Sequence, residues 1–245
     1  MGRIIAITSG KGGTGKTTST AAIASCLAYL GFRTVCLDGD VGLKNLDLVL
    51  GLADAAVTDF TDVISGRVPL EDAVIPHPDI QNLWLLSAPV SMRPEDIDPG
   101  DMAGLKQTLR QSYDYVLIDA PAGIGTGFHL CAAGADMAIV VSGGEPASLR
   151  DAERTAAELY AMGLKDVRLL INRYKRRLLK WTCSTMDDYI DRVGARLVGI
   201  VAEDESVSRA AALETALVLC DSKAAFQFLR VAKRITGQKV PVGRL

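Results

Sequence analysis

Short apolar runs recur along the chain, and their β-branched residues favour strands over helices. Seven such runs are predicted strands: Arg3–Thr8, Thr34–Leu37, Leu83–Leu86, Tyr115–Ile118, Met137–Val141, Val167–Ile171 and Leu197–Val201. Because each run is almost continuously apolar, both faces of each strand are expected to be buried, as in a parallel sheet.

Longer segments between these runs carry helical signals. The clearest are Lys16–Leu30, Met102–Ser112, Pro146–Met162 and Asp221–Ile235, several of which open with a capping residue or a proline. This alternation predicts an α/β fold of three layers, in which a doubly wound, mostly parallel sheet has its ligand crevice at the strands' carboxyl ends. A single domain is expected over residues 1–245, with a surface loop at 94–100 and a short basic tail at 237–245.

The composition narrows the class of protein. The chain has 245 residues, of which 49% are hydrophobic and 23% charged, so a sizeable core is available. Its net charge of −2 gives no overall attraction to nucleic acid or anionic lipid. Five cysteines without a CxxC pair suit reduced thiols, and neither a signal peptide nor a long apolar run is recognisable, so a cytoplasmic location is expected.

A phosphate-binding loop follows the first predicted strand and precedes the first predicted helix. It reads GKGGTGKTT and matches GxxxxGK[ST]. Its glycines let backbone N–H groups face the phosphates, Lys16 is placed to neutralise phosphate oxygens, and the Thr17 hydroxyl is a ligand for Mg²⁺. The predicted nucleotide-binding residues here are Gly10, Lys11, Gly12, Gly13, Thr14, Gly15, Lys16, Thr17 and Thr18.

A second lysine near the start of the loop, Lys11, is not needed by an ordinary phosphate loop. With it, GKGGTGKTT resembles the deviant Walker A motif of the MinD/ParA family of P-loop ATPases. The resemblance implies the P-loop fold of that type, an ATP hydrolase that uses ATP and Mg²⁺, and an ATP-dependent homodimer. It also implies that Lys11 acts in trans on the partner's phosphates.

Three aspartates follow predicted strands at the same edge of the sheet. Asp38 and Asp40 come after the second strand, and we assign Asp38 to the metal and Asp40 to orienting the attacking water. Asp119 ends the run VLID, which is typical of a Walker B strand that holds Mg²⁺. The run GLKNLD after Asp40 resembles the family's first switch, and the segment containing Pro121 and Gly123 resembles its second.

The base-binding side is indicated mainly by resemblance. No NKxD motif for guanine is found, whereas Asn172 and Arg173 end a predicted strand in a segment that resembles the family's adenine-contacting loop. Asn172 as an ordinary turn residue remains an alternative. Residues Ala202 to Asp204 resemble the second base-side loop, but Ala202 replaces the usual proline, so a backbone contact there would be held less rigidly.

Resemblance to the MinD branch of the family extends over roughly residues 1–234. It implies a role in selecting the division site together with MinC-like and MinE-like regulatory proteins. A ParA-like partition or positioning ATPase and a flagellar-placement regulator remain alternatives. The helix carrying Arg150, Asp151 and Glu153 corresponds to a partner-binding surface in such proteins, although ordinary helix-surface charge is the competing interpretation.

Two basic segments bear on membranes and DNA. The tail 237–245 contains proline and glycine and predicts no amphipathic lipid-binding helix, although a peripheral location at the inner face of the cell membrane stays open. Five basic residues lie within Arg173–Trp181. The stretch from Arg173 to Lys180 could therefore bind phosphates of lipid or DNA, and neither ligand is excluded. A solvated loop is the alternative.

Overall fold

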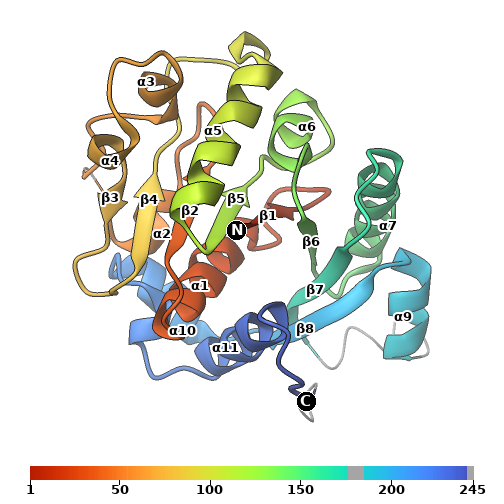
Figure 1. The fold of residues 1–245 in the computed structure, drawn as a ribbon. Coiled ribbons are helices and arrows are strands. Elements are labelled where there is room, and N and C mark those ends of the chain that lie inside the picture. Colours follow the sequence, from red (N-terminus) through yellow and green to blue (C-terminus); the bar gives the residue numbers. More distant parts are fainter. Residues whose placement is uncertain (54, 176–184, 242–245) are drawn as a thin grey trace.

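A computed structural model of the chain describes residues 1–53, 55–175 and 185–241. One eight-stranded sheet runs through it in the order β3-β4-β2-β5-β1-β6-β7-β8, and every neighbouring pair is parallel except β3 with β4 (Figure 1). The strands are β1 (Arg3–Thr8), β2 (Thr34–Asp38), β3 (Ile75–Pro76), β4 (Leu83–Leu86), β5 (Tyr115–Asp119), β6 (Met137–Ser142), β7 (Val167–Tyr174) and β8 (Arg196–Ala202).

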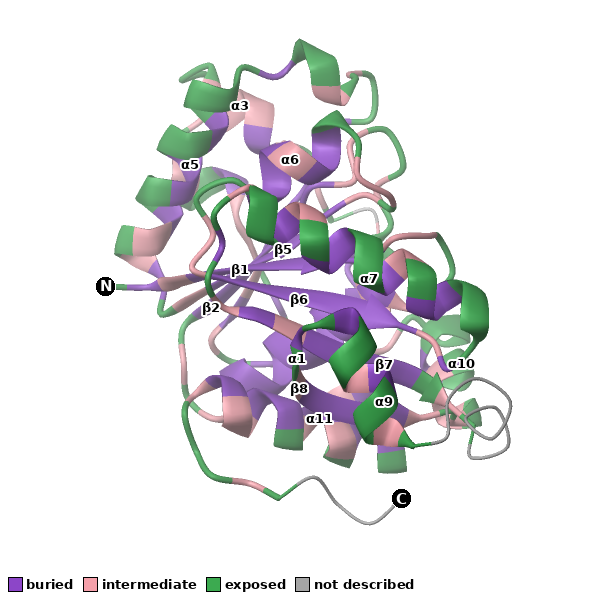
Figure 2. Cartoon of the chain, turned by 90° about the vertical axis from the view of Figure 1, so that its right-hand side faces the viewer, coloured by how far each residue is buried: buried purple, intermediate pink, exposed green. Residues whose placement is uncertain are grey.

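Helices cover both faces of this sheet, which makes three layers (Figure 2). One face packs against α1 (Lys16–Tyr29), α2 (Leu46–Leu50), α10 (Glu205–Ala212) and α11 (Lys223–Ile235). The other packs against α3 (Phe60–Ile64), α4 (Leu70–Ala73), α5 (Pro99–Ser112), α6 (Thr126–Ala132), α7 (Pro146–Ala161) and α9 (Met186–Val193). Short 3₁₀ turns lie at Pro94–Asp96 and Leu217–Leu219.

The central strand β1 shows why the strand sequences are almost purely apolar. Ile5 and Ile7 pack with the α1 and α11 side, whereas Ile4 and Ala6 pack with the opposite helices, and all four are fully buried. A strand between two helical layers has no solvent-facing positions to fill with polar residues. The predicted α/β fold class is therefore confirmed, and so are the seven predicted strands.

Most predicted elements differ from the observed ones by one to three residues at one or both ends, and three differences have a clear physical reason. β3 was missed because a two-residue antiparallel strand has no periodicity of its own. Residues 94–100 were predicted wrongly as a loop: α5 starts at Pro99, where the Asp98 carboxylate caps it by accepting hydrogen bonds from the Gly100 and Asp101 N–H groups. The last helix starts at Lys223 rather than Asp221, because Ser222 is its N-cap.

Sheet register brings the predicted site together. β5 lies between β1 and β2, and Asp38 is paired directly with Asp119 across β2 and β5. On the side of β5 that faces away from β2, β5 pairs with β1, and β1 ends in the loop that leads to α1. Within the described residues, no helix combines the length and apolar content needed to cross a bilayer.

Candidate nucleotide-binding site

The loop between β1 and α1 is shaped by glycines. Gly13 and Gly15 have φ angles of 79° and 83°, in the left-handed region that glycine adopts at little cost. Between them lies Thr14, whose buried hydroxyl is without a hydrogen-bond partner in the described part of the chain. A buried, unpaired hydroxyl in a loop of this kind suits a ligand that brings its own hydrogen-bonding oxygens.

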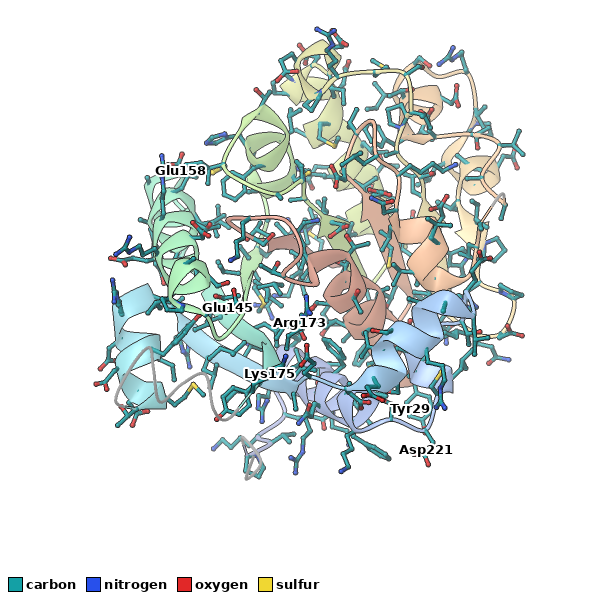
Figure 3. All side chains as sticks on the ribbon, turned by 180° about the vertical axis from the view of Figure 1, so that it is seen from behind. Tyr29, Glu145, Glu158, Arg173, Lys175 and Asp221 are labelled. Atoms are coloured by element: carbon teal, nitrogen blue, oxygen red, sulfur yellow. The ribbon has the colours of Figure 1, made fainter. Side chains whose placement is uncertain are left out.

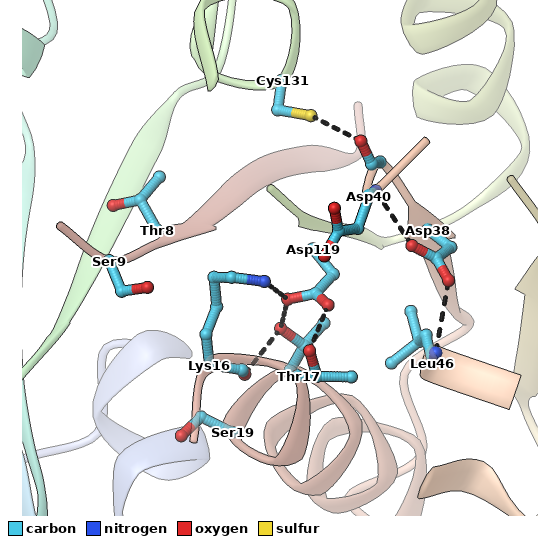
Figure 4. Close-up of polar contacts among 12 residues, drawn as sticks. Thr8, Ser9, Lys16, Thr17, Ser19, Asp38, Asp40, Leu46, Asp119 and Cys131 are labelled. Carbon is cyan, nitrogen blue, oxygen red and sulfur yellow. Dashed lines mark hydrogen bonds and ion pairs between the residues drawn. The ribbon is translucent and has the colours of Figure 1, made fainter. Parts of the chain in front are cut away.

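Lys16 and Thr17 meet the carboxylate of Asp119 at the start of α1 (Figure 4). Lys16 Nζ lies 3.0 Å from Asp119 Oδ1, and the Thr17 hydroxyl donates to Oδ2 at 2.7 Å. Thr20 also donates to Oδ1, at 2.9 Å. Lys16 and Asp119 are both buried, so charge-assisted hydrogen bonds hold the lysine at the amino end of α1, where phosphate binds in P-loop proteins.

Asp38 lies beside this network and is almost completely buried. Its two oxygens accept hydrogen bonds from the backbone N–H groups of Asp40 and Leu46, at 3.0 and 3.2 Å. Burial and the neighbouring Asp119 carboxylate raise the pKa of Asp38 to about 7. Asp40 is half-buried, and burial also raises its pKa, against the opposing effect of Lys16. Bringing these carboxylates together costs free energy that a cation would offset.

The donor set fits Mg²⁺. The Thr17 hydroxyl and the carboxylates of Asp119 and Asp38 are hard oxygen ligands, and the sheet register places the two aspartates side by side. Few protein oxygens are required, because Mg²⁺ usually keeps several waters and binds substrate phosphates as well. Among the described residues, no group of three or more histidine, cysteine or acidic side chains is arranged to hold a metal ion by itself.

Lys11 lies at the outer rim of the same loop. Its Nζ is 3.7 Å from Glu145 Oε2, and both side chains are partly exposed. Glu145 lies on one side of a cavity of about 190 Å³ that the loop borders, and Arg173 and Lys175 line the same cavity; Figure 3 shows these three side chains near one another. In this single chain, the charge of Lys11 is therefore directed at Glu145.

On the predicted base side, the side chains already have protein partners. Asn172 is buried and donates from Nδ2 to the Thr14 carbonyl at 2.9 Å. Arg173 donates to the Gly13 carbonyl at 3.2 Å. The Ala202 N–H donates to Gln227 Oε1, and Asp204 caps α10 and also accepts from Ser222 and the Ala224 N–H. The structure thus places Asn172 and Arg173 against the phosphate loop. It places Asp204 at the start of α10, where its carboxylate holds the ends of α10 and α11 together.

The basic segment Arg173 to Lys180 is described only through Lys175, and residues 176–184 lie outside the described part. Arg173 and Lys175 both pair with the carboxylate of Glu203. This carboxylate offsets part of the positive charge on which a nucleic-acid contact there would depend.

The predicted second switch and partner surface lie beside the loop. The Gly123 N–H donates to the Ser9 carbonyl at 2.9 Å. Pro121 packs against Gly127 at the start of α6. On α7, Arg150 and Glu153 are exposed, and Glu153 lies 3.5 Å from Arg192 of α9.

Gly10 and Asp151 connect α7 to the phosphate loop. A Cβ atom at Gly10 would come within 2.6 Å of both the Asp151 Cβ and its carbonyl oxygen. The loop therefore packs directly on α7, the helix of the predicted partner surface.

The sequence interpretation missed two residues of the site, Thr20 and Glu145. Thr20 could have been found, because it lies one turn after Thr17 on the same face of α1 and so points to the same carboxylate. Glu145 has no such signal, since only the tertiary fold brings the start of α7 to the rim of the loop.

Comparison with known proteins agrees with this geometry. A family model described as the CobQ/CobB/MinD/ParA nucleotide binding domain matches residues 5–217. The septum site-determining protein MinD of Thermotoga maritima is 36% identical over 99% of this chain and 91% of its own length.

Two solved structures show the same likeness. MinD in the MinC:MinD cell division protein complex of Aquifex aeolicus has a TM-score of 0.90 at 36% identity, over 99% of each chain. MinD of Pyrococcus horikoshii complexed with Mg-ADP has a TM-score of 0.83 at 30% identity, over 96% of each chain.

Proposed function

The chain belongs to the CobQ/CobB/MinD/ParA nucleotide-binding family, and from this premise we propose that it is an ATPase switch that acts in selecting the division site. The observation that carries the proposal is the meeting of Lys16, Thr17 and Asp119 at the start of α1, beside a loop that also holds Lys11. Likeness to MinD proteins over almost the whole chain supports the division-site role.

Each side chain of the phosphate site has a proposed role in binding or hydrolysis. Backbone N–H groups of the glycine loop and Lys16 bind the phosphates, so Lys16 exchanges Asp119 for phosphate oxygens when nucleotide enters. Asp40 orients the attacking water, because phosphoryl transfer depends mainly on positioning and charge. Mg²⁺ held by Thr17, Asp119 and Asp38 would neutralise charge on the phosphates.

Dimerisation would change the partner of Lys11. Its contact with Glu145 is long and partly exposed, so it contributes little stability and can be replaced at small cost. ATP in a second copy offers a denser negative charge than one carboxylate. We expect the ATP-bound homodimer to form when Lys11 leaves Glu145 for the partner's phosphates, and to separate after hydrolysis.

The proposed surface for binding a partner protein lies on α7. Arg150 and Glu153 are exposed there, and Asp151 packs on Gly10, so movement of the loop reaches this helix directly. A MinC-like protein is the partner proposed for this surface, since a MinD with 36% identity was solved in complex with MinC. A MinE-like stimulator and binding at a membrane surface belong to the same proposal.

The test compares ATP hydrolysis and solution mass for wild type, Asp40→Ala and Lys11→Ala, with Lys165→Ala as an exposed-lysine control. We expect Asp40→Ala to dimerise with ATP but to lose hydrolysis, and Lys11→Ala to stay monomeric. Hydrolysis at the wild-type rate in Asp40→Ala would show that its role is wrong. An ATP-dependent dimer of Lys11→Ala would exclude the action of Lys11 in trans.

A further inference from the structure

A second polar cavity lies away from the nucleotide loop, at the amino ends of β7 and β8. It has a volume of about 600 Å³, within the usual range for small-molecule sites. Arg168 is the second residue of β7 and Arg196 the first of β8, and residues 237–241, which follow α11, form the opposite wall. Figure 1 shows β8 beside α11, and the two elements pack against each other. Along β7, Arg168 and Tyr174 are separated by about 20 Å, so this cavity is distinct from the nucleotide crevice.

Among the described residues, the lining of this cavity contains four basic side chains, Arg168, Arg196, Arg234 and Lys239, and no acidic one. Such a concentration is unexpected in a chain with a net charge of −2. The carboxylate behind it is Asp166, which Arg168 holds through two hydrogen bonds of 2.8 and 3.0 Å. Arg3 binds the same carboxylate at 2.7 Å, and the charge of Arg196 also helps to lower the pKa of Asp166, so one negative charge is shared among three arginines.

Two of the four cations are fixed in place by the protein. Arg234 donates to the carbonyls of Val240, Val198 and Pro241 at 2.7 to 2.9 Å. These carbonyls carry no formal charge, and no carboxylate among the described residues forms a salt bridge with the guanidinium. Arg168 is held by Asp166, and its Nη1 has no hydrogen bond within the described residues. Side chains positioned in this way bind an anion without losing further conformational freedom.

The other two cations are available to a ligand. Arg196 and Lys239 are exposed, and among the described residues neither makes a side-chain hydrogen bond or a salt bridge, although Arg196 is close enough to Asp166 for its charge to act on that carboxylate. Leu197 and Val240 add apolar atoms to the lining, so the cavity offers contacts to a carbon skeleton as well as to charge. Guanidinium groups match phosphate oxygens because their N–H groups form two parallel hydrogen bonds.

The geometry points to a binding site for a small phosphorylated anion at the amino ends of β7 and β8, with Arg168, Arg196, Arg234 and Lys239 as its phosphate contacts. The phosphate comes either from a soluble metabolite or from the headgroup of a phospholipid, and both present the same chemistry. The described lining of the site includes none of the residues proposed for hydrolysis, so we expect its occupation to be independent of ATP hydrolysis.

The test uses the full chain saturated with Mg²⁺ and a non-hydrolysable ATP analogue, so that all three phosphate positions of the nucleotide crevice are filled. Inorganic phosphate is titrated at low salt, and its ³¹P linewidth reports binding. A parallel arm measures sedimentation with phosphatidylglycerol vesicles. The probe variant is Arg196→Glu with Lys239→Glu, and the matched control is Arg209→Glu with Lys223→Glu, an equal charge change at exposed residues away from the cavity.

We expect binding to weaken by roughly tenfold or more in the probe variant, as loss of two charge-assisted contacts predicts, and to stay within about twofold of wild type in the control. Selective loss in the phosphate arm identifies a soluble ligand, and selective loss in the vesicle arm alone identifies a lipid headgroup. No binding in either arm overturns the inference, and so does an equal loss in both variants. ATP hydrolysis should be unchanged in the probe variant.

Discussion

Replacing Gly10 with alanine tests the contact between the phosphate loop and α7. The added Cβ would lie 2.6 Å from the Cβ and carbonyl oxygen of Asp151 and 2.9 Å from its carbonyl carbon. Two of these three atoms belong to the helix backbone and cannot rotate away, so the loop must move. Overpacking of this kind costs about 1–3 kcal/mol. For a chain of this length, that corresponds to a fall in Tm of roughly 2–12 °C.

Gly12→Ala is the matched control in the same loop. A Cβ at Gly12 meets no atom within 4 Å, and its φ angle lies outside the left-handed region. The free energy of unfolding should therefore stay within about 0.5 kcal/mol of wild type or rise slightly.

Urea unfolding without nucleotide measures both variants, because the empty space at Gly12 is where phosphate is expected and ligand binding would confuse the comparison. Equal stability of Gly10→Ala and wild type, or an equal loss in both variants, would refute the packing of the loop on α7.

Three further perturbations test separate parts of the structure. Burial and the Asp119 carboxylate raise the pKa of Asp38 in the folded state to about 7. The protonated carboxyl therefore stabilises the fold fully below about pH 4, and this contribution is lost as pH rises through 7. Urea unfolding without Mg²⁺ should show the free energy of unfolding falling between pH 5 and pH 8, by roughly 2–4 kcal/mol more in wild type than in Asp38→Asn. Lys106→Met removes the hydrogen bonds that the buried Nζ donates to the carbonyls of Leu130, Cys131 and Ala133 at the end of α6. The free energy of unfolding in the same assay should fall by about 2–5 kcal/mol. An unchanged value would contradict a stabilising role for this lysine. Glu145→Gln removes the ion pair that holds Lys11. Sedimentation should then show ATP-dependent dimers at protein concentrations up to about fivefold lower than for wild type, because an exposed ion pair contributes about 1 kcal/mol at most. A weaker dimer than that of wild type would show instead that Glu145 supports assembly.

The sequence by itself determined the architecture and the phosphate loop. Strands buried on both faces must be apolar throughout, so β1, β2 and β5 were visible as runs with almost their final boundaries. The phosphate loop was equally visible, because its spacing of glycines, lysine and threonine is contiguous in the chain. Asp38 and Asp119 could be assigned to one edge for the same reason, since the carboxyl ends of parallel strands lie together.

Tertiary structure decided what each of these groups contacts. Lys11 and Glu145 are separated by more than a hundred residues, and no local pattern indicated that they form a pair. The Gly10 contact with α7 and the grouping of Arg168, Arg196 and Arg234 likewise join distant segments. Periodicity and spacing report on neighbours within a helix, strand or turn, whereas charge pairing and close packing between elements depend on crossovers and sheet register. Those relations exist only in the folded chain.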